Sequence, residues 1–282
     1  MKEMLKIGIA TYNKLPNLTE NDRLLIPIFE AKGHKIVPEI WDNPEVKWDT
    51  YDLVVVRSTW DYYLKPVAFK NWISQFVNSK TRLINSPEIV LKNSHKFYLK
   101  ELSKKGVNII PTLFSSEKIE LETIKFWEKV VIKPAVSAGS HETEVFETAD
   151  LTQDILDSKI ETGDWLIQPF LEEIKSAGEI SMLFFGGEFS HAIQKIPKSG
   201  DFRVQKQFGA QYLNYEPSRE LISTAKNIVE ITEKKSTYAH IDGVMTKNGF
   251  FLMEVEMIEP DLFFEHAPEG PNRFVEAVLK GL

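Results

Sequence analysis

Short apolar segments alternate with amphipathic stretches over the first third of the chain. A strand-like segment at 6–10 is followed by apolar residues at helical spacing, and further strand-like segments occupy 34–40 and 52–56. The last of these is apolar after its first residue, which is typical of a strand covered on both faces in a parallel sheet. Residues 1–88 are therefore predicted to form a small doubly wound, Rossmann-like α/β domain.

The pattern changes at Asn85-Ser86-Pro87, a cluster of turn residues. A lysine-rich stretch at 93–105 is predicted to form one helix that ends at Gly106. Beyond it, apolar runs are bounded by turn residues, such as the Gly186-Gly187 pair of a hairpin. These runs predict strands at 130–133, 165–169, 180–185, 189–196, 240–246 and 250–257.

The length of 282 residues exceeds what one compact core usually holds, so several packed subdomains are expected. We place an N-terminal substrate-binding domain at 1–88, a central subdomain at 89–166 and a C-terminal subdomain at 167–282. The expected fold class is α/β with α+β character, because the strand–helix alternation at the start gives way to hairpins.

The overall charge argues against a nucleic-acid partner. Lys and Arg number 34 against 41 Asp and Glu, so the net charge of -7 repels a phosphate backbone, although locally gathered cations can still bind a nucleotide. The chain has no cysteine, which excludes disulfides, thiolate metal sites and a cysteine nucleophile. The apolar run at 7–10 is too short for a signal sequence or a membrane span, so we expect a cytoplasmic protein without a membrane partner.

Several common catalytic motifs are absent from the sequence. It contains neither a G-x-x-x-x-G-K-[ST] loop nor a G-x-G-x-x-G fingerprint, and its six histidines show no H-E-x-x-H spacing. The segment 135–139 (Ala-Val-Ser-Ala-Gly) differs at its first position from the turn that carries a hydrolase serine. These observations disfavour a P-loop enzyme, a Rossmann dinucleotide enzyme and a serine hydrolase.

Carboxylates gather near the C-terminus. Side chains alternate along a strand, so Glu254 and Glu256 project from one face, and Asp242 lies on the preceding predicted strand. Magnesium prefers hard oxygen ligands and commonly binds a few carboxylates together with substrate phosphates. The pattern is consistent with a Mg²⁺ site at these three residues, and a solvent-exposed strand face is the alternative.

The turn between these two strands decides whether the three carboxylates meet. A two-residue loop at Asn248-Gly249 would direct Asp242 away from Glu254. A three-residue loop at 247–249, with Gly249 in the left-handed conformation, would place Asp242 opposite Glu254. The metal interpretation therefore predicts the three-residue loop.

Two further segments are suited to binding a nucleotide. Lys133 ends a predicted strand and precedes small residues at 135–140, whose backbone amides can approach phosphate oxygens. Gln168, Pro169 and Phe170 end another predicted strand, where backbone groups can read a planar base. A solvated lysine and an ordinary strand exit are the alternative interpretations of these two segments.

In their order along the chain, these segments resemble the ATP-grasp superfamily, and more narrowly its ligases with a glutathione-synthetase-like ATP-binding domain. The resemblance runs from Lys96 to Pro260 and includes Gly178-Glu179 and the stretch 195–203 (Lys-Ile-Pro-Lys-Ser-Gly-Asp-Phe-Arg). It implies an ATP-grasp fold with an N-terminal pre-ATP-grasp domain and two ATP-grasp subdomains.

The same resemblance implies roles for individual residues around ATP and Mg²⁺ or Mn²⁺. Those implied to bind the nucleotide are Lys96, Lys133 and Ser137 at the phosphates, Gln168 and Phe170 at the adenine, and Glu179 at the ribose, with Glu172 or Glu173 as substitutes. Those implied to act at the γ-phosphate and the acyl phosphate are Lys195 and Arg203. Those implied to hold the metal are Asp242, Glu254 and Glu256, the last of which stands where the superfamily commonly has asparagine.

Two segments, 57–62 (Arg-Ser-Thr-Trp-Asp-Tyr) and 254–263, also resemble the branch that contains the cyclo-ligase of cycloserine biosynthesis. The first follows a predicted buried strand, and ligands of open α/β sheets bind beyond the carboxyl ends of strands. We therefore predict that the substrate contacts Arg57, Ser58, Trp60 and Asp61, with Arg57 at a carboxylate and Asp61 at an amino group. An internal Arg57–Asp61 ion pair, with Trp60 as packing, is the alternative.

The implied activity is ATP-dependent ligation of a carboxylate to an amine through an acyl phosphate, a reaction that needs no protein nucleophile. The expected partners are small-molecule, amino-acid-like substrates, and in a cyclisation both reacting groups belong to one molecule. Attachment of an amino acid to a peptide or protein is one alternative, and it predicts a wide groove in place of a closed pocket. A nucleotide-binding protein without ligase activity is the other, and the complete set of lysines and carboxylates argues against it.

Overall fold

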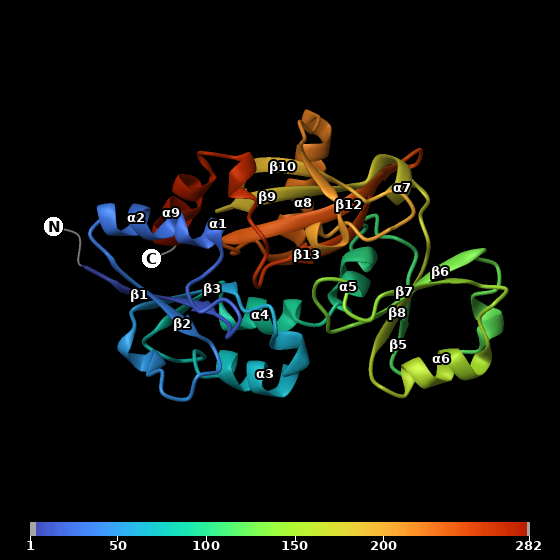
Figure 1. Cartoon of the computed structure of the whole chain (residues 1–282), viewed down its shortest axis with the longest axis horizontal. Helices are drawn as coiled ribbons and strands as arrows, with labels where there is room; N and C mark the ends of the chain where they lie inside the picture. The colour runs from blue at the N-terminus through green and yellow to red at the C-terminus, as the bar shows by residue number, and fades with distance from the viewer. Residues whose placement is uncertain (1–3, 281–282) are drawn as a thin grey trace.

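The structure is a computed structural model that describes residues 4–280. The described residues form three separate sheets, one in each of three parts of the chain. In Figure 1 the N-terminal domain (blue to cyan) and the green central subdomain lie toward opposite ends of the long axis, and the orange strands of the third sheet lie between and above them. No helix within residues 4–280 is long and apolar enough to cross a membrane.

The N-terminal domain is a parallel sheet with helices, as its apolar pattern predicts. Its strands run in the order β2-β1-β3-β4, and β3 is buried along its whole length because both faces of the sheet are covered. The strands are β1 (Lys6–Thr11), β2 (Lys35–Ile40), β3 (Leu53–Ser58) and β4 (Arg82–Ile84), and the helices are α1 (Glu20–Arg23), α2 (Leu25–Ala31) and α3 (Pro66–Ser74).

The single helix predicted at 93–105 is wrong, because the structure has two short helices there. These are α4 (Pro87–Asn93) and α5 (Tyr98–Lys104). Lys96 lies in the turn between them, and its backbone N–H donates to the carbonyl of Ala135 at 2.8 Å. This contact with the central subdomain replaces a helical hydrogen bond, so the chain leaves the helical path at Lys96.

The central subdomain is an antiparallel sheet in the order β5-β8-β6-β7. Its elements are β5 (Leu113–Ser115), β6 (Lys129–Pro134), β7 (Glu144–Glu147), α6 (Gln153–Ile160) and β8 (Trp165–Pro169). Val130, Leu156 and Trp165 belong to a core built only from residues of this subdomain. A part of the chain with its own core can move as a unit.

The domain boundaries expected from the sequence need correction at both ends of the central subdomain. A boundary after residue 166 would cut through β8, all of which pairs with β6. A boundary before residue 89 would assign α5 to this subdomain, yet Leu99 and Leu102 pack in one cluster with Met182 and Ile241 of the C-terminal sheet. We therefore propose 113–169 as the extent of the central subdomain.

The C-terminal part is built on an antiparallel sheet in the order β11-β10-β9-β12-β13. Terminal helix α9 buries Phe274 and Val278 in a cluster that also contains Phe29 of α2, so the N-terminal domain and this sheet share a core. The elements are α7 (Glu173–Ala177), β9 (Glu179–Phe185), β10 (Glu188–Ile196), β11 (Gln211–Asn214), α8 (Arg219–Glu233), β12 (Tyr238–Thr246), β13 (Gly249–Glu256) and α9 (Gly270–Lys280). Short 3-10 turns lie at Trp48–Thr50, Tyr62–Leu64, Leu121–Thr123, Lys206–Phe208 and Phe264–His266.

The turn between β12 and β13 differs from the expected three-residue loop. Thr246 pairs with Gly249, so only Lys247 and Asn248 lie in the loop. Farther along, the register shifts by one residue between Gly243 and Asp242, and Asp242 then pairs with Glu254. The loop prediction is wrong, whereas the predicted pairing of Asp242 with Glu254 is correct, because a bulge inside the hairpin supplies the shift.

Candidate active site

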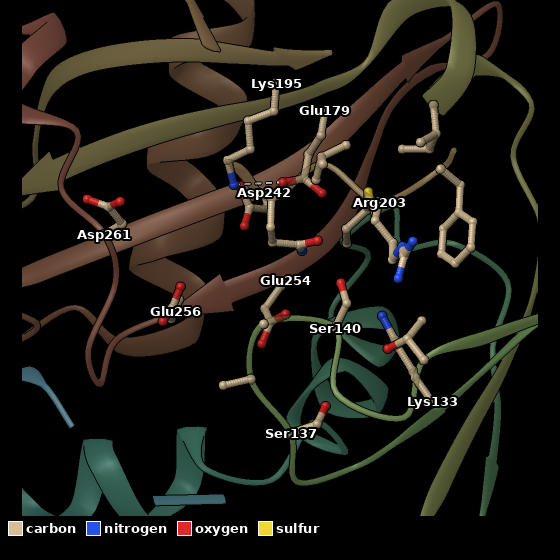
Figure 2. Close-up of a pocket in the computed structure, with 18 of the residues that line it drawn as sticks. Lys133, Ser137, Ser140, Glu179, Lys195, Arg203, Asp242, Glu254, Glu256 and Asp261 are labelled. Atoms are coloured by element: carbon tan, nitrogen blue, oxygen red, sulfur yellow. Dashed lines mark hydrogen bonds and ion pairs between the residues drawn. The ribbon is translucent and has the colours of Figure 1, made fainter. Parts of the chain in front are cut away.

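A cavity of about 580 Å³ lies where the three parts of the chain meet. Its volume is within the usual range of small-molecule sites. Residues from all three parts line it: Tyr12, Trp60 and Tyr63 from the N-terminal domain, Lys133, Ser137 and Ser140 from the central subdomain, and Lys195, Asp242, Glu254 and Glu256 from the C-terminal sheet. Figure 2 shows this convergence of cations and carboxylates.

The predicted metal carboxylates all reach this cavity. Asp242 and Glu254 face each other across β12 and β13, and Glu256 follows one period later on β13. Within residues 4–280, however, no group of three or more His, Cys, Asp and Glu side chains is arranged to hold a metal ion by itself. These residues form no all-protein cage, so a metal ion bound here would need part of its coordination from a ligand such as a phosphate.

Lys195 holds two carboxylates at the base of the cavity. Its Nζ lies 2.8 Å from Glu179 Oε1 and 3.1 Å from Asp242 Oδ1, contacts that are dashed in Figure 2. Burial raises the pKa of the Glu179 carboxyl to about 7, and the charge of Asp242 adds to this rise. Burial also opposes the charge on Lys195, but Asp242 and Glu179 outweigh it and raise the pKa of the ammonium.

His240 is a site residue that the sequence interpretation missed. Its Nε2 lies 2.8 Å from Asp242 Oδ1 and its Nδ1 lies 3.5 Å from Glu256 Oε2. Burial disfavours the imidazolium, but Asp242 and Glu256 raise the pKa of His240 to about 9. A positive His240 offsets the negative charge that Glu256 adds. The available signal was its position two residues before Asp242, which places both side chains on one strand face.

The two lysines expected at phosphates differ in their surroundings. Lys96 is buried, and its Nζ donates to the carbonyl of Ser137 at 2.6 Å and lies 3.0 Å from Glu254. Lys133 lines the cavity, and its ammonium group makes no hydrogen bond or ion pair with the described residues. Burial lowers the pKa of the Lys133 ammonium. Lys133 is therefore a cation without a partner at the cavity wall, where an anionic ligand would relieve its burial.

Arg203 lines the cavity from the loop that follows β10. Its guanidinium binds the carboxylate of Asp201, with Nη2 at 2.7 Å from Oδ2, and stacks on the ring of Phe208 at 3.8 Å. The ion pair lowers the pKa of Asp201 far below its usual range. Arg203 is held at the site by contacts within its own loop.

The segment expected at the adenine lies at the junction of β8 and α7. Gln168 and Phe170 line the cavity, and Gln168 Nε2 donates to the hydroxyl of Thr112 at 2.9 Å. Glu172 and Glu173 are not among the lining residues. Glu172 instead binds Lys175 at 3.0 Å, so Glu179 is the one of the three glutamates expected at the ribose that lines the cavity.

The geometry agrees with comparison of the chain to protein families. A family model for the ATP-grasp domain of prokaryotic glutathione synthetase matches residues 95–263, more than half of the chain. The chain belongs to this ATP-grasp family. A second model, for the N-terminal domain of D-cycloserine synthetase DcsG, matches residues 7–85. The chain is thus an ATP-dependent ligase with an ATP-grasp fold, similar to the cycloserine-biosynthesis branch.

Individual ATP-grasp proteins resemble the chain over nearly its whole length. The cycloserine biosynthesis protein DcsG of Streptomyces lavendulae is 24% identical over 278 residues, which are 91% of this chain and 93% of that protein. The crystal structure of D-cycloserine synthetase DcsG superimposes with a TM-score of 0.85 at 21% identity and covers 98% of this chain and 99% of its own. D-alanine–D-alanine ligase from Bacillus anthracis gives 0.68 at 14% identity, with 98% and 97% covered.

The ATP-grasp ligase PsnB, solved in complex with a minimal precursor, gives a TM-score of 0.70 at 14% identity and covers 99% of both chains. At such identities, these structures support the fold alone. The expected ATP-grasp fold with an N-terminal Rossmann-like domain is therefore confirmed.

The substrate contacts expected of the segment 57–62 need correction. Arg57 and Ser58 are 2% and 0% exposed, and both bind the buried carboxylate of Asp22 rather than facing the cavity. Asp61 accepts a hydrogen bond from the Trp41 indole at 2.7 Å and also lies outside the lining. Of the four residues expected there, only Trp60 lines the cavity.

The alternative Arg57–Asp61 ion pair is also not formed, because Arg57 pairs with Asp22 and Asp61 pairs with Lys65. Arg57 Nη2 donates to the carbonyl of Pro260 at 2.5 Å, and the Trp60 indole N–H donates to the carbonyl of Glu259 at 3.1 Å. These contacts tie the N-terminal domain to the segment that follows the carboxylate strand β13. Arg57 and Trp60 thus both bind the segment that follows β13, and Trp60 in addition lines the cavity.

Proposed function

We propose that the chain ligates a carboxylate to an amine on a small amino-acid-like substrate, through an acyl phosphate and with Mg²⁺. One observation carries the proposal: Lys133, the Lys195–Asp242 pair, Glu254 and Glu256 line a single cavity of about 580 Å³, and the Lys133 ammonium has no ion-pair partner within residues 4–280. A cavity of this volume is within the usual range of small-molecule sites, which supports a small-molecule substrate. The similarity to cycloserine-biosynthesis proteins supports an intramolecular reaction.

In the proposed reaction, the substrate carboxylate takes the γ-phosphoryl group of ATP, which gives an acyl phosphate and ADP. The amine then attacks the acyl carbon, loses a proton and expels phosphate. Lys133 and Lys96 would bind the nucleotide phosphates, with the small-residue loop around Ser137 beneath them. Lys195 and Arg203 would stabilise charge on the transferred group.

Gln168 and Phe170 would bind the adenine, and Glu179 the ribose. Asp242, Glu254 and Glu256 would hold Mg²⁺, because they offer hard oxygen ligands beside the proposed phosphate position. The ion would supply charge screening for the triphosphate and the acyl phosphate. In the ligand-free chain, Lys96 and Lys195 take up part of this negative charge through their contacts with Glu254 and Asp242.

The proposal is tested by trapping the acyl phosphate. The protein is incubated with ATP, hydroxylamine and a panel of amino acids and their hydroxylated or ureido derivatives, with and without Mg²⁺. Hydroxamate and ADP should appear in equal amounts for a subset of acids, and only with the metal. ADP release without hydroxamate from any acid would contradict ligation, and equal turnover without divalent metal would contradict the metal assignment.

A further inference from the structure

One end of the cavity is aromatic and acidic, and the proposed roles of ATP and Mg²⁺ leave this end unused. We call it the aromatic–acidic end and define it by Tyr12, Trp60, Tyr63, Glu259 and Asp261, all of which line the cavity. Figure 2 shows Asp261 on the opposite side of the cavity from Lys133 and Arg203. Asp261 therefore lies away from the cations Lys133 and Arg203.

Glu259 is the central observation at this end. Its side chain is 2% exposed, and its Oε2 has no hydrogen-bond partner within residues 4–280. Buried acceptors are normally paired, so an unpaired carboxylate oxygen at a cavity wall indicates a donor that comes with the ligand. Burial, together with the charge of Glu256, raises the pKa of Glu259 well above its usual range. A bound cation would favour the ionised carboxylate.

Asp261 supplies a second carboxylate that is held in position. Its Oδ1 accepts the backbone N–H of Phe263 at 3.2 Å, and the side-chain amide of Asn21 lies 3.4 Å from the same oxygen. Burial raises the pKa of Asp261 as well. Within residues 4–280, neither Glu259 nor Asp261 forms a salt bridge with a lysine or arginine: the nearby Arg57 and Lys96 pair with Asp22 and Glu254 instead.

The aromatic side chains complete the surroundings. The Trp60 indole is fixed by its hydrogen bond to the Glu259 carbonyl, and its ring centroid lies 6.5 Å from that of Tyr12. Tyr63 contacts the ring of His141 in the loop of the central subdomain at 4.8 Å. Aromatic faces beside carboxylates are the surroundings that favour an organic ammonium group, through cation–π attraction and charge.

We infer that the aromatic–acidic end binds a protonated primary amino group of the substrate. Glu259 and Asp261 supply the negative charge, and the rings of Trp60, Tyr12 and Tyr63 surround the bound ammonium group. This inference rests on the proposed ligase function for the identity of the molecule that carries the amine. Carboxylates keep the proton on the bound nitrogen, so this nitrogen is a poor nucleophile. It anchors the substrate and is distinct from the amine that attacks the acyl phosphate.

A binding experiment tests the subsite without knowledge of the substrate. Saturation-transfer NMR compares n-propylammonium with 1-propanol, which differ in the charged group, on the full chain. We expect transfer to propylammonium only, and about tenfold weaker binding in Glu259→Gln and in Asp261→Asn, because each removes one charge. Glu188→Gln is the matched control, since Glu188 is exposed and pairs with Lys226 away from the cavity.

Two results would overturn the inference: equal transfer to the alcohol, or propylammonium binding that survives both substitutions. Glu259→Gln should fold, because glutamine has the shape of the carboxyl group it replaces and carries no charge to bury. Asp261→Asn provides an independent variant. Loss of propylammonium binding on addition of Mg²⁺ alone would assign the carboxylates to a metal ion and would also overturn the inference.

The hydroxamate assay separates this inference from the proposed function. Amino acids and their 2-hydroxy analogues, such as alanine and lactate in both enantiomers, are compared as acyl donors. Two results together would support both the ligase function and the ammonium subsite. The amino acids should be preferred by about tenfold or more in kcat/KM, and Glu259→Gln should lose this preference while its KM for ATP stays unchanged. Ammonium binding without hydroxamate from any acid would reject the ligase function and retain the subsite. Equal use of both series would reject the subsite and retain the ligase.

Discussion

Asp242 lies directly opposite Glu254, although the loop that joins their strands contains two residues and not three. Gly243 pairs with Leu252 and Asp242 with Glu254, which leaves Met253 as an extra residue in β13. A bulge re-aims the side chains that follow it, and here it brings both carboxylates to the cavity. The bulge therefore determines the register on which the proposed metal site depends.

Gly243 should be essential to this arrangement. A Cβ atom at this position would lie 2.2 Å from the ring of Phe250 and 2.6 Å from the carbonyl oxygen of Phe251. Gly243→Ala should lower the free energy of unfolding by about 1–3 kcal/mol because the hairpin must shift. Urea unfolding measures the loss, and an unchanged midpoint would contradict the close approach. Asp242 shifts with the hairpin, so ligase activity should fall in parallel.

Lys133 should dominate nucleotide affinity among the cavity lysines, because its ammonium group makes no ion pair or hydrogen bond with the described residues. Lys133→Ala should weaken ATP binding by about 10- to 100-fold, the usual effect of removing a charge-assisted hydrogen bond. Calorimetric titration measures the affinity. Lys125→Ala is the control, since Lys125 pairs with Glu122 on the outside of the central subdomain. An unchanged affinity would remove Lys133 from the site.

Arg203 should affect turnover more than nucleotide affinity. Its proposed partner is charge that develops during phosphoryl transfer, so Arg203→Ala should lower kcat by about 100-fold or more and change ATP binding little. Steady-state kinetics with a substrate from the hydroxamate panel measures both. A loss confined to ATP affinity would show that Arg203 binds the nucleotide before phosphoryl transfer and does not stabilise the transition state. Asp201→Asn should retain activity, because it removes only the carboxylate that holds the guanidinium in this structure.

The buried Arg57–Asp22 pair should contribute to folding rather than to catalysis. The two side chains are 2% and 3% exposed and lie 2.8 Å apart. Arg57→Ala leaves a buried carboxylate without its partner and should cost about 3–5 kcal/mol in urea unfolding. Arg23→Ala breaks an exposed pair with Glu20 and should cost less than about 1 kcal/mol. Equal effects of the two substitutions would contradict the burial argument.

His191 should make the folded chain sensitive to mild acid. Burial lowers its pKa from 6.5 to about 4, so between these values the unfolded chain binds more protons than the folded chain. The free energy of unfolding therefore has its full value, as far as His191 is concerned, above about pH 6.5. It falls by up to about 3 kcal/mol as the pH drops to about 4. The melting temperature of His191→Gln should decline less over this interval, and parallel pH profiles would contradict the assignment.

Local sequence was sufficient for the family and for many of the elements, but not for the break between α4 and α5 or for the loop between β12 and β13. The parallel N-terminal sheet, the hairpins and the terminal helix follow from the period of apolar residues, which depends only on neighbours along the chain. The order of Lys133, Gln168, Lys195 and the carboxylates identified an ATP-grasp ligase. Such patterns can be recognised in a sequence because they consist of residue types with defined chemistry in a fixed order.

Tertiary structure decided which side chains reach the cavity. Arg57 lies near the end of β3 and Trp60 just beyond it, yet Arg57 binds Asp22 while Trp60 lines the cavity, and residue type alone does not distinguish the two. The pKa of His240 is set by burial, by Asp242 on the same strand and by Glu256 on β13, and the pKa of Glu259 is set by burial and by Glu256. The burial of both side chains depends on packing between residues far apart in sequence. The sequence thus determined the family and many of its elements, whereas the packing of the three parts determined which side chains line the cavity and the environment of each charge.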